Sequence, residues 1–123
     1  MTTDHRPLSP HLQIYRPQMT SVLSILHRAS GLILAAGTLL VVWWFWTIMS
    51  GAGSYAVAHG FFNGLFGRLL LFVWSLCMFY HLCNGVRHLV WDMGYALEIK
   101  QAYMAGWIAI GIAVVLTAAA WLL

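Results

Sequence analysis

Three of the six histidines, His27, His81 and His88, lie in or beside long stretches without charge, where an imidazole is costly unless it is satisfied. His81 is the deepest of them. It lies within the uncharged residues 69–86 and 11 residues before Asp92, which is about 16 Å along a helix. A neutral imidazole in an apolar, water-poor site is a good axial ligand for haem iron. The spacing gives equal weight to a second interpretation, in which His81 only forms a hydrogen bond across helices.

One face of this second apolar stretch carries polar or small residues at helical spacing. His81, Gly85, His88 and Asp92 follow one another at intervals of four, three and four residues. They therefore fall within about 60° of arc on a helix. Gly85 lies one turn from His81, and its missing side chain would let a flat ring approach the backbone.

A second polar cluster opens the preceding apolar stretch and consists of Ser24, His27, Arg28, Ser30 and Gly31. If the two stretches are antiparallel helices, this cluster lies at the height of Arg87 and His88 and forms a polar rim at one membrane interface. Such a rim could hold the carboxylates of a buried ligand by charge-assisted hydrogen bonds, or donate hydrogen bonds to a quinone carbonyl. The alternative is that the two arginines only extend to the interface at the helix ends.

The expected depths bear on haem ligation. By helical rise, His81 lies about 10 Å deeper than the rim, to which His27 belongs. Two axial histidines from this one chain are therefore geometrically awkward. If His81 binds haem together with a second histidine, that histidine must come from another chain.

The composition points to a lipid environment. Of 123 residues, 62% are hydrophobic and 7% are charged, against about 25% charged residues in an ordinary soluble domain. This excludes a conventional water-soluble enzyme. The net charge of +3 is scattered rather than gathered in a stripe, so a nucleic-acid partner has no support. Cys77 and Cys83 lie six residues apart in one apolar stretch, and we expect neither a disulfide nor a zinc site nor an iron–sulfur cluster from them.

We expect an all-α fold of three transmembrane helices running up, down and up, because each span takes about 20 apolar residues. The expected segments are an N-terminal arm, a first span, a loop with room for one surface turn, a second span, a polar connection and a third span: residues 1–20, 21–49, 50–65, 66–91, 92–101 and 102–123. In the third span, small residues recur every four positions and could let another helix pack closely: Ala105, Ala109, Ala113 and Thr117.

The positions of the Lys and Arg residues predict the orientation. The side of the arm and the 92–101 connection carries all six of them except Arg68. This places the N-terminus on the cytoplasmic side, or on the matrix side in a mitochondrion. The beginning of the chain resembles neither a cleavable signal peptide nor a mitochondrial leader, so we expect a bacterial inner membrane, with the mitochondrial inner membrane as the alternative.

Three blocks of the sequence resemble one known family, in that family's order: residues 6–15 (RPLSPHLQIY), 24–31 (SILHRASG) and 81–94 (HLCNGVRHLVWDMG). They are similar to the cytochrome b membrane-anchor subunit of succinate dehydrogenase, respiratory complex II, of the mitochondrial and alphaproteobacterial type. The resemblance covers essentially the whole chain, and the three blocks together are highly specific.

The resemblance implies a set of roles for residues of this chain. His81 matches an axial ligand of haem b, whose second axial histidine comes from another small anchor subunit. Ser24 and Arg28 match positions that help to line the ubiquinone site near the iron–sulfur subunit. His27, Arg28 and His88 match residues close to the haem propionates.

The function implied by the resemblance is that of a subunit without catalytic residues of its own. It would anchor the flavoprotein and iron–sulfur subunits in the membrane and help electrons from succinate to reach ubiquinone, in the tricarboxylic acid cycle and respiratory chain. One alternative is the anchor of a fumarate reductase, which uses the same site in the reverse direction. Another is a membrane scaffold without a cofactor, in which His81 only packs.

Overall fold

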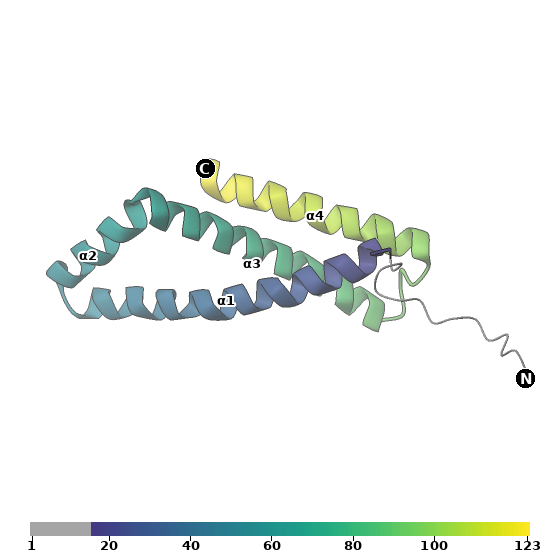
Figure 1. The fold of residues 1–123 in the computed structure, drawn as a ribbon, viewed down its shortest axis with the longest axis horizontal. Helices are drawn as coiled ribbons and strands as arrows, with labels where there is room; N and C mark the ends of the chain where they lie inside the picture. Colours follow the sequence, from purple (N-terminus) through teal and green to yellow (C-terminus); the bar gives the residue numbers. More distant parts are fainter. Residues whose placement is uncertain (1–15) are drawn as a thin grey trace, which may run out of the picture.

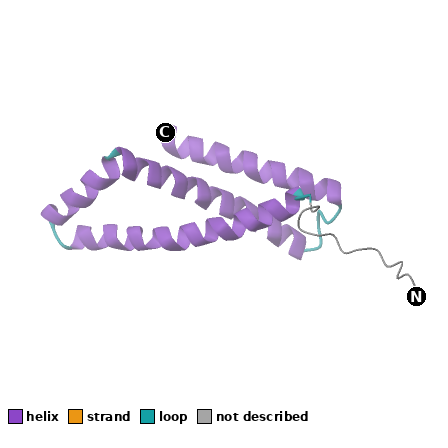
Figure 2. Cartoon of the chain, in the orientation of Figure 1, coloured by secondary structure: helices purple, strands orange, loops and turns teal. Residues whose placement is uncertain are grey.

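The computed structural model describes residues 16–123, which form four helices and no strand (Figure 1, Figure 2). The helices are α1 (Met19–Met49), α2 (Ala52–Asn63), α3 (Leu65–Asp92) and α4 (Ile99–Leu122). Three of them, α1, α3 and α4, are long and apolar enough to cross a membrane, and each contains 18 consecutive residues with a mean hydropathy of 2.0, 1.7 and 2.1, respectively. The prediction of an all-α fold with three spanning helices is therefore confirmed. Residues 1–15, which hold most of the expected arm and the first family-like block, lie outside the described part.

The helices α1 and α3 run antiparallel and cross near the beginning of α1, and they separate towards α2 (Figure 1). The helix α4 runs along α3 and also contacts α1. We call the end that holds the start of α1, the end of α3 and the start of α4 the crossing end, and the opposite end the α2 end. All the candidate site residues lie towards the crossing end.

A helix occupies most of the region where a loop was expected, residues 50–65. Its 12 residues, Ala52–Asn63, form α2 between Gly51 and Gly64. Packing explains this helix better than local propensity does, because two of its 12 residues, Gly53 and Gly60, are glycines. Ala58 is fully buried, and the ring of Phe61 meets Trp43 of α1 edge to face at 5.9 Å.

A close contact between α1 and α3 fixes their spacing near the middle of both helices. The indole of Trp74 lies directly against Gly37, and a Cβ atom at position 37 would overlap the ring. Glycine is required there because any other residue would push the helices apart. Beyond this contact the helices diverge, and α1, α2 and α3 enclose an apolar cavity of about 520 Å³ lined by residues such as Leu40, Trp44 and Phe62.

The small-residue stripe of the third span packs against helices of the same chain. Ala109, Ala113 and Thr117 are buried, and Ala105 is half-buried. The helix that packs most closely on α4 is α3, and the two are also joined at the α2 end, where Trp121 Nε1 donates a hydrogen bond to Ser75 Oγ at 2.9 Å. Small residues allow this close approach, as expected for helices that associate in lipid.

Candidate functional site

Three histidines come together where α1 and α3 cross. The rings of His27 on α1 and His81 on α3 are stacked, with centroids 3.9 Å apart and planes inclined by 13°. The ring of His27 also lies 5.2 Å from the ring of His88, with the planes inclined by 50°. The three side chains predicted to serve a cofactor therefore form one continuous group.

This arrangement corrects the expected depths. A difference of about 10 Å between His27 and His81 is wrong, because their rings touch. The helix α1 begins at Met19, so His27 lies eight residues, or about 12 Å, inside the helix rather than at its end. The two histidines consequently lie at nearly the same height.

The imidazole of His81 is held in one protonation form by its neighbours. Its Nδ1 lies 3.1 Å from the backbone carbonyl oxygen of His27 and 3.1 Å from Ser30 Oγ. The Ser30 hydroxyl donates its own hydrogen to that same carbonyl at 2.8 Å, so towards His81 it can only accept. Both neighbours of Nδ1 are thus acceptors, and Nδ1 must carry the proton. A neutral ring with its proton on Nδ1 has its lone pair on Nε2, which is the form that a metal ligand requires.

The glycine that makes room for the His81 ring lies on α1 and not on α3. A Cβ atom at Gly31 would lie 3.1 Å from His81 Cε1, which is tighter than an ordinary contact. At Gly85, the position singled out from the sequence, a Cβ atom would meet only His27 Cε1 at 3.9 Å. Within the described residues, Gly31 is therefore the glycine that the histidine group needs.

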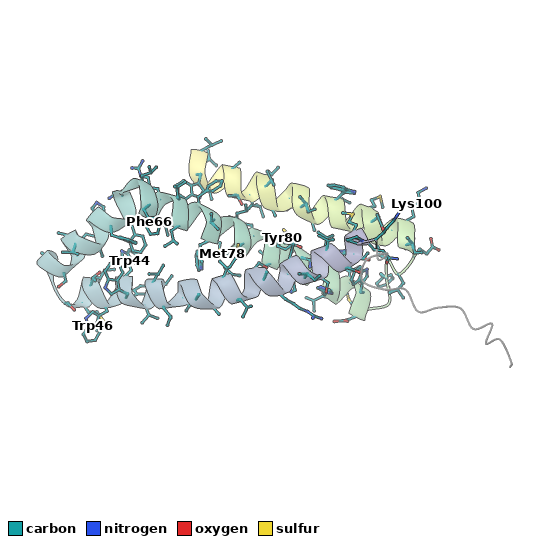
Figure 3. The ribbon with its side chains drawn as sticks, viewed as in Figure 1. Trp44, Trp46, Phe66, Met78, Tyr80 and Lys100 are labelled. Atoms are coloured by element: carbon teal, nitrogen blue, oxygen red, sulfur yellow. The ribbon has the colours of Figure 1, made fainter. Side chains whose placement is uncertain are left out.

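A tyrosine hydroxyl fastens the two helices beside this group. Tyr80 lies near the crossing of α1 and α3 (Figure 3), and its hydroxyl donates a hydrogen bond to the carbonyl oxygen of Leu23 at 2.8 Å. The bond joins residues 57 positions apart in the sequence. It helps to set the register in which His27 meets His81.

Arg87 does not take part in the predicted rim. Its side chain is 5% exposed, and its guanidinium donates hydrogen bonds to Asn84 Oδ1 and to the carbonyl oxygen of Ala102 in α4, both at 3.2 Å. The guanidinium also lies 4.0 Å from the centre of the Trp91 ring, a cation–π contact. Nη1 and Nη2 of Arg87 therefore join α3 to α4, while its buried Nε has no hydrogen-bond partner within residues 16–123. Because the side chain is buried, both the rim role and the simple interfacial role predicted for it are wrong.

The two remaining candidates lie on α1. Ser24 is half-buried and Arg28 is exposed. They are four residues apart and so share one face of the helix. Arg28 and Arg87 do not converge on one site, since Arg87 is directed towards α4.

Two residues of the site have roles that the sequence did not reveal. Ser30 was noticed only as part of a polar cluster, and its bond to His81 depends on how α1 meets α3. Asn84 is fully buried and bonds to Arg87. The available signal for Asn84 was an amide within the otherwise apolar residues 69–86, only three positions after His81.

Comparison with known proteins gives a consistent answer along the whole chain. Residues 2–120 match the family described as the succinate dehydrogenase/fumarate reductase transmembrane subunit. A succinate dehydrogenase cytochrome b560 subunit of Reclinomonas americana is 40% identical over 97% of this chain and 86% of its own length. Cytochrome b556 subunits of succinate dehydrogenase are 41% identical in Rickettsia prowazekii, over 94% of this chain and 90% of the relative, and 39% identical in Paracoccus denitrificans, over 91% and 86%. With three membrane-spanning helices and this degree of similarity, the chain belongs to the family of succinate dehydrogenase/fumarate reductase transmembrane subunits.

Proposed function

We propose that this chain is the haem b membrane anchor of a succinate:ubiquinone oxidoreductase, with His81 as one axial ligand of the haem iron. The observation that carries the proposal is the state of the His81 ring, whose Nδ1 is held by two acceptors so that Nε2 keeps its lone pair. Hydrogen-bond acceptors at the other ring nitrogen orient metal-binding histidines and fix their tautomer. The cytochrome b names of the relatives support the same cofactor. When bound, haem b supplies one-electron transfer.

The second axial ligand would come from another anchor subunit. The ring of His27 lies face to face with that of His81, so these two rings would not hold one metal ion between them. The stacking therefore supports a haem shared between two subunits, and this support does not depend on the depths that were expected from the sequence.

His27, Arg28 and His88 would lie near the haem propionates. Nδ1 of His27 is buried and has no hydrogen-bond partner within residues 16–123, and a carboxylate oxygen would satisfy a proton at that atom. Arg28 is exposed beside His27 and could form charge-assisted hydrogen bonds with such a group.

Ser24 and Arg28 would contribute to the ubiquinone site. Both side chains can donate hydrogen bonds to a quinone carbonyl oxygen, and the Arg28 charge would stabilise the negative charge that grows there during reduction. Their location near the crossing end supports docking of the iron–sulfur and flavoprotein subunits at that end. By the distribution of Lys and Arg, that end would face the cytoplasm, or the matrix in a mitochondrion.

The family also includes fumarate reductase anchors, so quinol oxidation linked to fumarate is the second candidate function. It would use the same residues in the opposite direction. Rates with succinate plus quinone and with fumarate plus quinol, measured on the same purified complex, separate the two.

Replacing His81 with alanine tests the haem assignment. In the purified complex, H81A should abolish or strongly diminish the haem b band in a reduced-minus-oxidised spectrum, because iron loses one of its axial ligands. The matched control is H59A, since His59 lies on α2 and contacts only Tyr55 among the ring pairs described. A haem band that H81A leaves unchanged would refute the assignment.

A further inference from the structure

A buried polar group lies on α3 beside the three histidines, and the proposed function has not used it. Asn84 is fully buried, and Arg87, three residues later, is 5% exposed. The Asn84 side chain lies between Arg87 Nη1, at 3.2 Å, and His88 Nε2, at 3.5 Å. The three residues thus form a chain of contacts from a fixed cation to a histidine of the site.

Elementary hydrogen-bond chemistry decides the direction of these contacts. Arginine has only donors, so the atom of Asn84 that faces it must be the amide oxygen. The amide nitrogen then faces His88, and an amide nitrogen can only donate. Nε2 of His88 must therefore accept, which requires a ring without a proton on that nitrogen.

The arginine at the start of this chain cannot readily turn away. Its second amino group is bound to the carbonyl oxygen of Ala102, and its plane rests on the Trp91 ring. Trp91 is itself anchored, because Nε1 donates a hydrogen bond to the carbonyl oxygen of Ala96 at 3.1 Å. Trp91 also contacts His88, and the two rings meet edge to face at 5.3 Å. His88 is thus held by Asn84 and Trp91 together.

We propose that Arg87 and Asn84 are positioning residues that keep His88 neutral with its proton on Nδ1. His88 then offers Nδ1–H as a hydrogen-bond donor to an oxygen acceptor of the ligand bound at His81. The identity of that acceptor, a haem carboxylate, rests on the proposed function. The protonation form of His88 does not, because it follows from contacts within this chain.

The direct test is the ¹⁵N magnetic resonance spectrum of the purified complex in lipid at about pH 8, with histidine as the only labelled residue. The signals of His88 are those that disappear in H88Q. We expect Nδ1 of His88 to be protonated and Nε2 to be unprotonated. A proton on Nε2, alone or together with one on Nδ1, would overturn the proposal.

The variant N84D tests whether Asn84 is the cause. Aspartate has nearly the same shape as asparagine, but its ionised carboxylate can only accept, so Nε2 of His88 should become protonated. N63D is the matched control, since Asn63 is exposed at the end of α2, and it should leave His88 as in the wild type. An unprotonated Nε2 in N84D would show that Asn84 does not determine the form of His88.

The variant R87K tests the role of the arginine. Lysine also has only donors, so it should keep the amide oxygen of Asn84 turned towards it and preserve the wild-type signals of His88. A protonated Nε2 in R87K would show that donors alone at position 87 do not hold the amide oxygen of Asn84, and would overturn the hydrogen-bond argument from which the form of His88 is inferred.

The same spectra separate this inference from the proposed function. In H81A the protonation form of His88 should be that of the wild type, even though haem is lost. A wild-type complex that contains no haem, but in which His88 carries its proton on Nδ1, would refute only the proposed function. A complex with haem ligated by His81 in which Nε2 of His88 is protonated would refute only the inference.

Discussion

Two arginines near the crossing end illustrate how the same residue type takes opposite roles. Arg87 is buried, and its charge is balanced by an amide oxygen, a backbone carbonyl oxygen and an aromatic face. Such a side chain joins helices, and its burial keeps it away from the exposed surface of the chain. Arg28 is exposed on α1, one turn after Ser24, and is the arginine that we propose for the quinone site.

For the variant R28A we expect a loss of quinone reduction without a loss of succinate oxidation. Removing a charge-assisted hydrogen bond costs about 2 kcal/mol, which corresponds to a roughly 30-fold lower kcat/KM for quinone. Succinate oxidation with an artificial dye should be unchanged, because the dye takes its electrons upstream of the membrane anchor. The control R68A changes an exposed arginine near the α2 end. An equal loss of both activities in R28A would indicate misassembly instead of a quinone-binding role.

At the scale of the helices, the contact between Gly37 and Trp74 determines how α1 and α3 meet. Both residues also line the apolar cavity that extends towards the α2 end. On the crossing side of this contact the helices are close enough for His27 and His81 to stack, and on the other side they diverge. The geometry of the site therefore depends on a residue that does not belong to it.

The variant G37A should lower the thermal stability of the complex and reduce its haem content. A methyl group at position 37 would overlap the Trp74 ring, and overpacking of this kind typically costs about 1–3 kcal/mol. The matched control is G111A, because a Cβ atom at Gly111 of α4 meets nothing within 4 Å. Melting temperature and haem per protein are the measurements. Equal values for G37A and G111A would contradict the importance of this contact.

At the scale of the whole molecule, this chain leaves much of its apolar surface uncovered. Many large apolar side chains are exposed along all three long helices, which suits lipid and partner helices. The three histidines are each half-buried, so the chain by itself does not enclose them completely. If His81 binds haem as proposed, the rest of the complex would complete the site.

The full chain purified without its partners should consequently lack a haem with two axial histidines. We expect haem added to the isolated chain to show the optical spectrum of a single axial histidine, and free imidazole to convert it to the spectrum of the two-histidine form. The complex, in which a partner would supply the second ligand, should not respond to imidazole. A two-histidine spectrum from the isolated chain that disappears in H27A would show that one chain is sufficient.

The sequence by itself determined the three spanning helices and the candidates for the site. Apolar length and helical periodicity are local properties, and in lipid a long apolar stretch has few alternatives to a helix. For the same reason, the small-residue stripe of the third span and the place of His81 deep in the second could be located without a structure. The roles of Ser24, Arg28 and the three histidines rested on resemblance to a family and remain predictions.

Only the tertiary structure decided which of these residues meet. That His27 stacks on His81, that Ser30 holds His81 Nδ1 and that Arg87 is directed towards α4 all follow from the register of one helix against another. The register is set by contacts far apart in the sequence, such as Tyr80 with Leu23 and Trp74 with Gly37. The helix α2 forms in a segment rich in glycine, and it too depends on packing against the other helices. Periodicity specifies which face of a helix a residue occupies, but only packing between helices specifies what that face touches.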